Sequence, residues 1–394
     1  MRKLSLVAIA FYLNILAAFS QTTTTDSSQY RARKLTLSEI NLVSSYYHQD
    51  GNNSAVTGGV GTEKLTDLSN TIELKLNKTD TRNRLHSFNV EVGVDHYTSA
   101  SSDKIDPSTI SSPSSADTRI YPTLGYSIKN PATGITTGAE LSFSSEFDYS
   151  SKGLAFHVAK SSKDNNREIG LKLQAYLDKW DVILPIELRT INDEGVHKPR
   201  NSYSASLSFS QVVNQRLQFS LLADAVSQKG LLATSYQRVY FKDNSESYEQ
   251  LPDSRFKIPV AIKASYFLGD RFVIRSSYRY YTDNWGVTAH TADLEVPVKI
   301  TPFFSVSPFY RYYTQTAADY FAPYKQHNIN DHFFTSDYDL SQFNSQFFGT
   351  GVRATPEKGV FGIAHWSMAE LRYGHFTRNN GLNSNIISLN ARFK

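Results

Sequence analysis

The chain has 394 residues, with 41 Lys and Arg against 37 Asp and Glu, and it contains no Cys. A net charge of +4 is too small to indicate a nucleic-acid partner, and the absence of Cys excludes a disulfide framework and a lipoprotein anchor. A mean hydropathy of −0.39 fits a soluble protein, but it also fits a membrane β-barrel, in which about half of the strand residues face water. The 24 Tyr and 24 Phe favour the barrel, because aromatic rings concentrate at both membrane interfaces.

The first 20 residues have the form of a secretory signal peptide. A basic pair precedes an apolar run from Leu4 to Ala18, and small residues follow. Residues 21–37 lack an apolar period and are interpreted as a periplasmic lead-in to a single domain, residues 38–394. No later run reaches the roughly 18 apolar residues that a helical membrane span needs.

From about residue 38 onward, short stretches alternate apolar and polar residues, as β-strands with one apolar face do. Residues 88–95 place Phe and three Val on one face and Asn, Glu, Gly and Asp on the other. Residues 204–209 alternate three serines with apolar residues, and a row of serines suits a wet lumen better than a dry core. The last stretch, residues 385–394, repeats the alternation and has the aromatic Phe393 next to its end, as expected of a closing strand.

The connections between these stretches alternate in length. Short connectors rich in Asn, Asp, Gly and Pro lie at 130–134, 163–167, 212–216, 269–271, 301–302 and 356–359. Long connectors lie at 50–66, 100–118, 179–201, 226–255 and 315–344. This rhythm predicts an all-β fold, a transmembrane antiparallel up-and-down β-barrel of about sixteen strands, with short periplasmic turns and long extracellular loops.

Three prolines are the main objection to this strand count. Pro259, Pro297 and Pro308 fall inside strand patterns, where proline removes a hydrogen-bond donor from the ladder. A soluble β-sandwich is the rival fold, and recovery of the protein in a soluble fraction would favour it.

The charges opposite the apolar faces differ between the two halves of the chain. The acidic candidates for the lumen are Glu73, Glu91, Asp95, Glu140, Glu146 and Asp148. The basic candidates are Lys257, Lys263, Arg271, Arg275, Arg279, Lys299, Arg311, Arg353 and Arg372. In a closed ring these halves become opposing walls, which predicts a polarised pore. The alternative is that the same charges pair with one another across a narrow, plugged interior.

The motif YRYYT occurs twice, at 278–282 and 310–314, on strands expected to run toward the extracellular side. Alternation turns Arg279 and Arg311 inward and leaves tyrosines at the depth of an aromatic girdle. A sugar-binding ladder of aromatic and basic groups is the functional alternative.

Neither a metal site nor a catalytic site has a clear motif. The weak metal candidates, at or beyond strand ends, are His48, Asp50, His96, Asp103 and Asp106, and their spacing matches no EF-hand or zinc pattern. A barrel hydrolase would need a site at the outer rim, for which His157 and His290 are available. No nucleophile elbow or other catalytic signature accompanies them, so no cofactor, metal or catalytic residue is assigned.

Five longer stretches resemble an uncharacterised family of bacterial surface proteins of about this length, known only as a domain of unknown function. They are SSYYHQDGNNSAVTGG at 44–59, DHYTSASSDKIDP at 95–107, LPDSRFKIP at 251–259, EVPVKITPFF at 295–304 and GLNSNIISLN at 381–390. The resemblance implies an outer-membrane β-barrel of Gram-negative bacteria. It implies no substrate and no catalytic residues.

The expected function is a porin-like channel or transporter that passes small polar solutes across the outer membrane. The alternatives are a closed structural, assembly or surface-receptor barrel and, next, a barrel hydrolase. The expected partners are outer-membrane lipid and lipopolysaccharide, the barrel insertion machinery and a second copy of the chain, with no nucleic acid.

Overall fold

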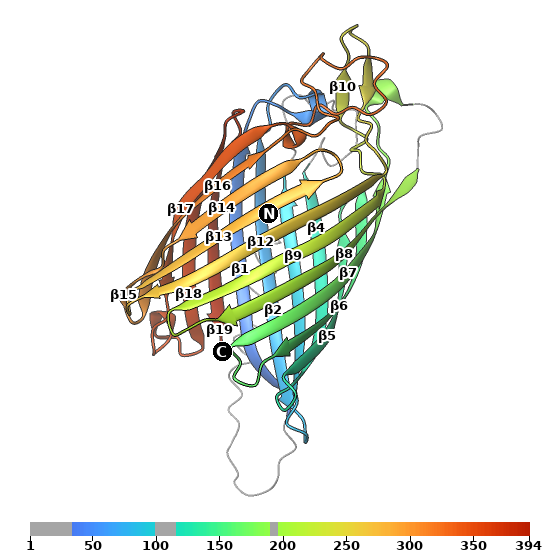
Figure 1. The fold of residues 1–394 in the computed structure, drawn as a ribbon. Coiled ribbons are helices and arrows are strands. Elements are labelled where there is room, and N and C mark those ends of the chain that lie inside the picture. The colour runs from blue at the N-terminus through green and yellow to red at the C-terminus, as the bar shows by residue number, and fades with distance from the viewer. Residues whose placement is uncertain (1–33, 99–115, 190–195) are drawn as a thin grey trace, which may run out of the picture. The chain divides into compact units, whose positions relative to one another are not determined.

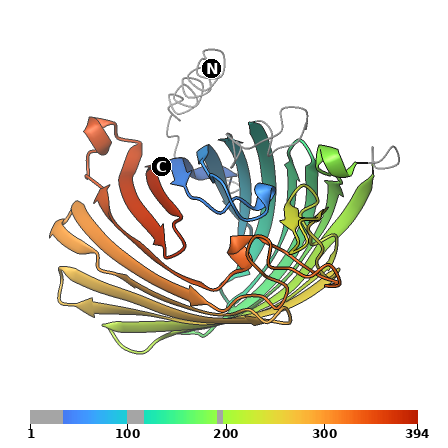
Figure 2. The same cartoon turned by 90° about the horizontal axis from the view of Figure 1, so that it is seen from above.

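The computed structural model describes residues 34–98, 116–189 and 196–394. The predicted signal peptide and all but the end of the lead-in lie outside these residues. The first strand begins at Thr36, two residues before the predicted start of the barrel. Residues Leu35–Lys394 form one unit, in which antiparallel strands make a closed ring (Figures 1 and 2).

The ring follows chain order and closes through a pairing of the first strand with the last. Its strands are β1 (Thr36–Asp50), β2 (Leu65–Thr79), β3 (Leu85–Tyr97), β4 (Asp117–Asn130), β5 (Ile135–Ser145), β6 (Tyr149–Ser161), β7 (Arg167–Asp181), β8 (His197–Val212), β9 (Leu217–Gly230), β12 (Ser254–Leu268), β13 (Phe272–Asp283), β14 (Thr288–Glu295), β15 (Val298–Thr301), β16 (Phe304–Gln315), β17 (Phe343–Ala354), β18 (Trp366–Arg378) and β19 (Asn383–Phe393). Because β14 and β15 occupy one position in the wall, the barrel has sixteen strands, as predicted.

All the predicted short connectors lie at one end of the barrel, here called the turn end, and all the long ones lie at the other, the loop end. The backbone has a positive φ at Asn83 and Asn165, which close two of the turns, since Asn tolerates the left-handed conformation. The predicted alternation of short turns and long loops is therefore confirmed.

The outer face of the ring is apolar. Leu124, Phe156, Leu207 and Leu371 are each more than half exposed, and each occupies the outward position of its strand. Large apolar side chains in such numbers are stable on a barrel surface only against lipid hydrocarbon, so this is a transmembrane barrel. Within the described part of the chain, no helix is long and apolar enough to span a membrane.

The prolines are accommodated at breaks in the ladder. Pro297 separates β14 from β15, and Pro308 of the neighbouring β16 lies opposite this break, where its carbonyl accepts from the Val296 amide at 3.0 Å. An amide hydrogen at position 308, which proline lacks, would point to the same neighbouring strand as this carbonyl. That strand is already interrupted between β14 and β15, so the missing donor leaves no regular ladder bond unmade. Beside Pro259, the β12–β9 register skips from Lys257 to Val260.

Two long connections pack together at the loop end. The connection 231–253 carries the hairpin of β10 (Arg238–Tyr240) and β11 (Glu246–Tyr248), and it bridges to the connection 316–342 through Gln250 and Phe334, whose amides and carbonyls bond reciprocally at 2.7 and 3.1 Å. Val239, Phe241 and Phe334 form a small buried core between the two connections. Together these connections, 231–253 and 316–342, are called the loop cap.

Candidate functional site

Basic side chains gather on the lumen face of β12 to β18. On β13 the exposed Tyr278 and Tyr280 mark the outward positions, so alternation turns Arg275 and Arg279 inward. The same alternation turns inward Lys257 and Lys263 on β12, Lys299 on β15, Arg311 on β16, Arg353 on β17 and Arg372 on β18. This surface is called the basic wall.

A cavity of about 460 Å³ lies along the basic wall. Its charged lining residues are Lys263, Arg275, Arg279, Arg311, Arg372, Asp293 and Glu295, so cations outnumber carboxylates. The rings of Phe309 and Phe347 also line the cavity, and the Arg372 guanidinium lies 5.0 Å from the Phe309 ring centroid. Lys263 and Arg279 have no hydrogen-bond or ion-pair partner among the described residues, which leaves both cations available to a solute.

The carboxylates in this cavity neutralise part of the basic wall. The Glu295 carboxylate lies 2.9 Å from Arg372 Nη1 and 3.3 Å from Arg275 Nη1. Asp293 pairs with Arg311, its partner across the β14–β16 ladder. These pairs hold the long arginine side chains along the wall.

Acidic side chains gather on β2, β3 and β5. Glu73, Glu91, Asp95 and Glu140 all occupy inward positions, and this surface is called the acidic wall. Glu73 and Glu91 are direct partners across the β2–β3 ladder, an arrangement of like charges that destabilises a sheet. The Glu73 side chain remains 21% exposed, and water at this surface reduces that repulsion because it screens the charges.

Two lysines that were not among the predicted site residues neutralise part of the negative charge of the acidic wall. Lys75 Nζ lies 3.3 Å from Glu73, and Lys172 Nζ lies 2.8 Å from Glu140. Strand alternation alone places both lysines inward, so the same pattern that found the acids would have found them. Glu91 has no ion-pair partner within the described ranges.

The two walls face each other. Eight positions separate β3 from β13 in either direction around the sixteen-strand ring. In residues 34–98, 116–189 and 196–394, no ion pair joins the acidic wall to the basic wall, and every pair described above stays within one wall. The arrangement therefore differs from charges that pair across a narrow interior.

Three of the predicted lumen residues lie elsewhere. Glu146 and Asp148 belong to the connection between β5 and β6, and Arg271 belongs to the turn between β12 and β13. Their assignment to the strand walls is wrong, because the alternation that supported it ends with β5 at Ser145 and with β12 at Leu268.

Glu146 and Asp148 instead line a second cavity of about 480 Å³ at the loop end, called the mouth cavity. Strand-end and loop residues share its lining, which includes Tyr97, Trp180 and Arg200 from the strands and Tyr236, Gln237, Asp337 and Asp339 from the loop cap. The Arg200 guanidinium lies 5.0 Å from the Trp180 ring centroid. The loop cap therefore forms part of the entrance to the barrel.

Two acids of the loop cap have pKa values well above the ordinary range of a carboxyl group. Burial, reinforced by the neighbouring Asp337, raises the pKa of Glu249 to about 8. The Glu249 carboxyl accepts from the Thr234 amide at 2.6 Å and from the Thr335 hydroxyl. Burial and the nearby Asp339 raise the pKa of Asp337 to about 7. Burial of these two acids near neutral pH is therefore coupled to their protonation.

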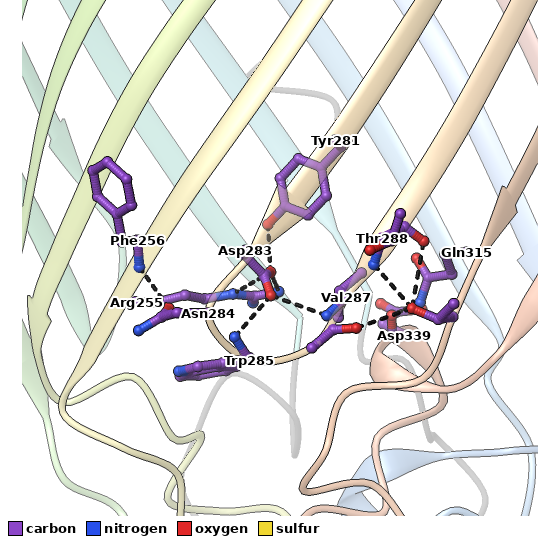
Figure 3. A network of polar contacts seen from close by, with 12 residues as sticks. Arg255, Phe256, Tyr281, Asp283, Asn284, Trp285, Val287, Thr288, Gln315 and Asp339 are labelled. Atoms are coloured by element: carbon purple, nitrogen blue, oxygen red, sulfur yellow. Dashed lines mark hydrogen bonds and ion pairs between the residues drawn. The ribbon is translucent and has the colours of Figure 1, made fainter.

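A polar network anchors the strand ends beneath the cap (Figure 3). The fully buried Asp283 carboxylate accepts from the Tyr281 hydroxyl at 2.6 Å, from Arg255 Nε at 2.9 Å and from the Trp285 amide at 2.9 Å. The Arg255 guanidinium stacks 4.3 Å from the Trp285 ring centroid. Gln315, at the end of β16, donates to the carbonyls of Asp339 and Ser341, which fixes the base of the second cap connection.

The repeated YRYYT motifs divide between the two faces of the barrel. Tyr278 and Tyr280 point outward, as do Tyr310 and Tyr312, each about 40% exposed. The third tyrosine of each motif faces inward, where the Tyr313 hydroxyl donates to Gln315 at 2.5 Å. The outward tyrosines occupy the position of an aromatic girdle.

The histidines named as metal or catalytic candidates are dispersed. His48 and His96 lie on outward positions and bond to Thr66 at 3.0 Å and Thr118 at 2.9 Å, and His290 bonds to Tyr278 at 2.7 Å. Asp103 and Asp106 lie outside the described residues. Within the part of the chain that is described, no group of three or more His, Cys, Asp or Glu could hold a metal ion.

Solved structures that the chain resembles are outer-membrane proteins. A bacterial polysaccharide outer-membrane secretin is 10% identical, with 90% of this chain and 98% of that chain covered and a TM-score of 0.43. OccAB1 of Acinetobacter baumannii is 10% identical, with 90% and 95% covered and a TM-score of 0.42. A BenF-like porin of Pseudomonas fluorescens is 9% identical, with 90% and 98% covered and a TM-score of 0.43. At these values the likeness is distant and transfers no activity to this chain.

No curated protein matches the chain. A family profile matches residues 76–373, which reach from β2 to β18 and include most of both walls, the loop cap and the Asp283 network. The chain therefore belongs to the family described as a protein of unknown function, DUF3570.

Proposed function

We propose that this barrel lies in the outer membrane of a Gram-negative bacterium and conducts small polar solutes, with a preference for anions. The observation that carries the proposal is the pair of opposed walls, whose ion pairs, as far as the chain is described, run within each wall and not between them. Rings of sixteen strands are wide enough to leave an aqueous channel. A lumen with unpaired charges on both sides retains water and orients a dipolar solute.

The preference for anions follows from the charges that remain after pairing. On the basic wall, four cations have no ion-pair partner among the described residues, namely Lys257, Lys263, Arg279 and Lys299, and two of them, Lys263 and Arg279, line the same cavity. On the acidic wall, Glu91 and Asp95 have no ion-pair partner within the described ranges, while Glu73 and Glu140 have lysine partners. The excess of cations concentrates anions in the lumen.

Single-channel recording in planar bilayers tests this proposal. Refolded protein that shows heat-modifiable mobility on a gel should produce discrete current steps in potassium chloride. Folded protein that produces no current would contradict the channel and favour a closed structural barrel.

Capture of a ligand at the surface is a second candidate function, and the mouth cavity favours it. Trp180 and three tyrosines, Tyr97, Tyr149 and Tyr236, line this cavity beside several carboxylates, which is a chemistry suited to polyhydroxylated or cationic ligands. A ligand that blocks the current from the loop-end side, but not from the turn-end side, would support an entry site.

A further inference from the structure

Three lysines lie on the outer face of the barrel, close to the loop end. They are Lys152 on β6, Lys179 on β7 and Lys229 on β9, all exposed. On β6 and β7 they continue the outward rows of Leu154 and Leu177, which are 40% and 54% exposed. The lysines therefore lie at the edge of the apolar band and point away from the lumen.

The strand register brings these lysines together, and they are called the lysine triad. Lys152 lies opposite Leu177, and Lys179 follows two residues later on the same face. On the next strand, β8, Asn201 lies opposite Lys229 of β9, so Lys229 continues the outward row that begins at Lys152. Since neighbouring strands lie about 4.8 Å apart, the triad spans about 15 Å of the barrel surface.

The triad forms no ion pair with a carboxylate in the ranges that the structure describes. None of the three lysines has a hydrogen-bond or ion-pair partner in the described part of the chain. Asp181 shares this face and hydrogen-bonds to His197, so one carboxylate lies beside the three lysines. At the turn end, the outward Lys160 and Arg167 bond to neutral groups: Lys160 donates to the Thr133 carbonyl, and Arg167 donates to Gln211 at 2.9 Å. The loop end thus presents a net positive charge, three lysines against one carboxylate, where the apolar band stops.

We propose that the lysine triad docks lipopolysaccharide, the glycolipid of the outer leaflet, through the phosphate groups of its headgroup. The aliphatic stems of the lysines cover the edge of the apolar band, and the ammonium groups reach the depth of the lipid headgroups. Leu154 and Leu177, directly below, contact the acyl chains of the same lipid. The proposal rests on the outer-membrane location proposed above, but not on the passage of solutes.

Native mass spectrometry of the detergent-solubilised full barrel, titrated with diphosphorylated lipid A, tests the proposal. The combined variant Lys152→Gln, Lys179→Gln and Lys229→Gln should bind about a hundredfold more weakly, because each lysine near an anionic lipid surface contributes roughly fivefold. The matched control is Lys78→Gln, Lys160→Gln and Lys163→Gln, which removes the same charge at the turn end. This control should bind within about twofold of the wild-type protein.

Three results would overturn the proposal. They are unchanged lipid binding by the triad variant, equal weakening by the control, and equal binding of dephosphorylated lipid A. Inorganic phosphate that displaces the lipid at equal phosphorus concentration would also overturn it, because the site would then recognise a free anion. Heat-modifiable mobility verifies that each variant is folded. The channel is assessed separately, because the triad variant should keep the wild-type conductance.

Discussion

Replacing Glu249 by Gln should remove a pH-dependent element from the closure of the loop cap. Glu249 is 3% exposed, and its carboxyl is neutral near pH 7 because burial raises its pKa to about 8. Gln keeps the shape of the protonated acid. Its amide oxygen can accept from the Thr234 amide, and its NH2 group can donate to the Thr335 hydroxyl.

The sign and size of the effect follow from the two pKa values. Below pH 4.5 the carboxyl is protonated in both the closed and the opened cap, and closure keeps its full stability. Between pH 4.5 and about 8 only the opened cap ionises, so the closed cap loses up to about 5 kcal/mol across this range. Asp337, whose pKa is raised to about 7, adds a loss of the same sign.

Hydrogen exchange of residues 238–250 and 321–335, corrected for intrinsic rates, measures this opening. The wild-type cap should exchange progressively faster, beyond the intrinsic change, as the pH rises from 5 to 9. The Glu249→Gln cap should retain only the smaller slope that Asp337 contributes. Glu246→Gln, on the same hairpin, serves as the control and should follow the wild type. If Glu249→Gln showed the full wild-type slope, burial of this carboxyl would not be the cause.

Two further substitutions test the anchor network and the orientation of the strands. Asp283→Asn leaves the Arg255 guanidinium without its buried carboxylate. In a denaturant titration it should therefore lower the free energy of unfolding of the barrel by about 3–5 kcal/mol. A change below about 1 kcal/mol would contradict the network in Figure 3. Leu207→Arg on the lipid face should lower the stability in bilayers by about 2–4 kcal/mol, whereas Ser208→Arg, one position along and facing the lumen, should be tolerated. Equal effects would mean that the inward and outward faces are assigned the wrong way round.

The barrel itself could be predicted from the sequence because its two signals are local. Alternation of apolar and polar residues identifies the faces of each strand, and connector length identifies the end of the barrel. Arg279 and Glu91 could therefore be placed inward by counting along their own strands. The limits of this reasoning appear at Glu146 and Arg271, where the strands end and the alternation no longer determines direction.

The loop cap could not be predicted because its contacts join distant parts of the chain. Phe241 and Phe334 pack edge to face with ring centroids 5.0 Å apart, although more than 90 residues separate them. Neither connection has a repeating pattern that would reveal this pairing. The prolines present the same difficulty, because only the register shows that Pro308 lies opposite the break at Pro297.

The reversal potential across a planar bilayer with a potassium chloride gradient tests the central claim most directly. The wild-type barrel should prefer chloride, and the combined variant Lys263→Gln and Arg279→Gln should shift the reversal potential toward that of potassium. Lys152→Gln with Lys179→Gln removes the same charge from the outer face and should leave the potential unchanged. A folded barrel that prefers potassium, or whose selectivity is the same in all three proteins, would contradict a lumen polarised by these walls.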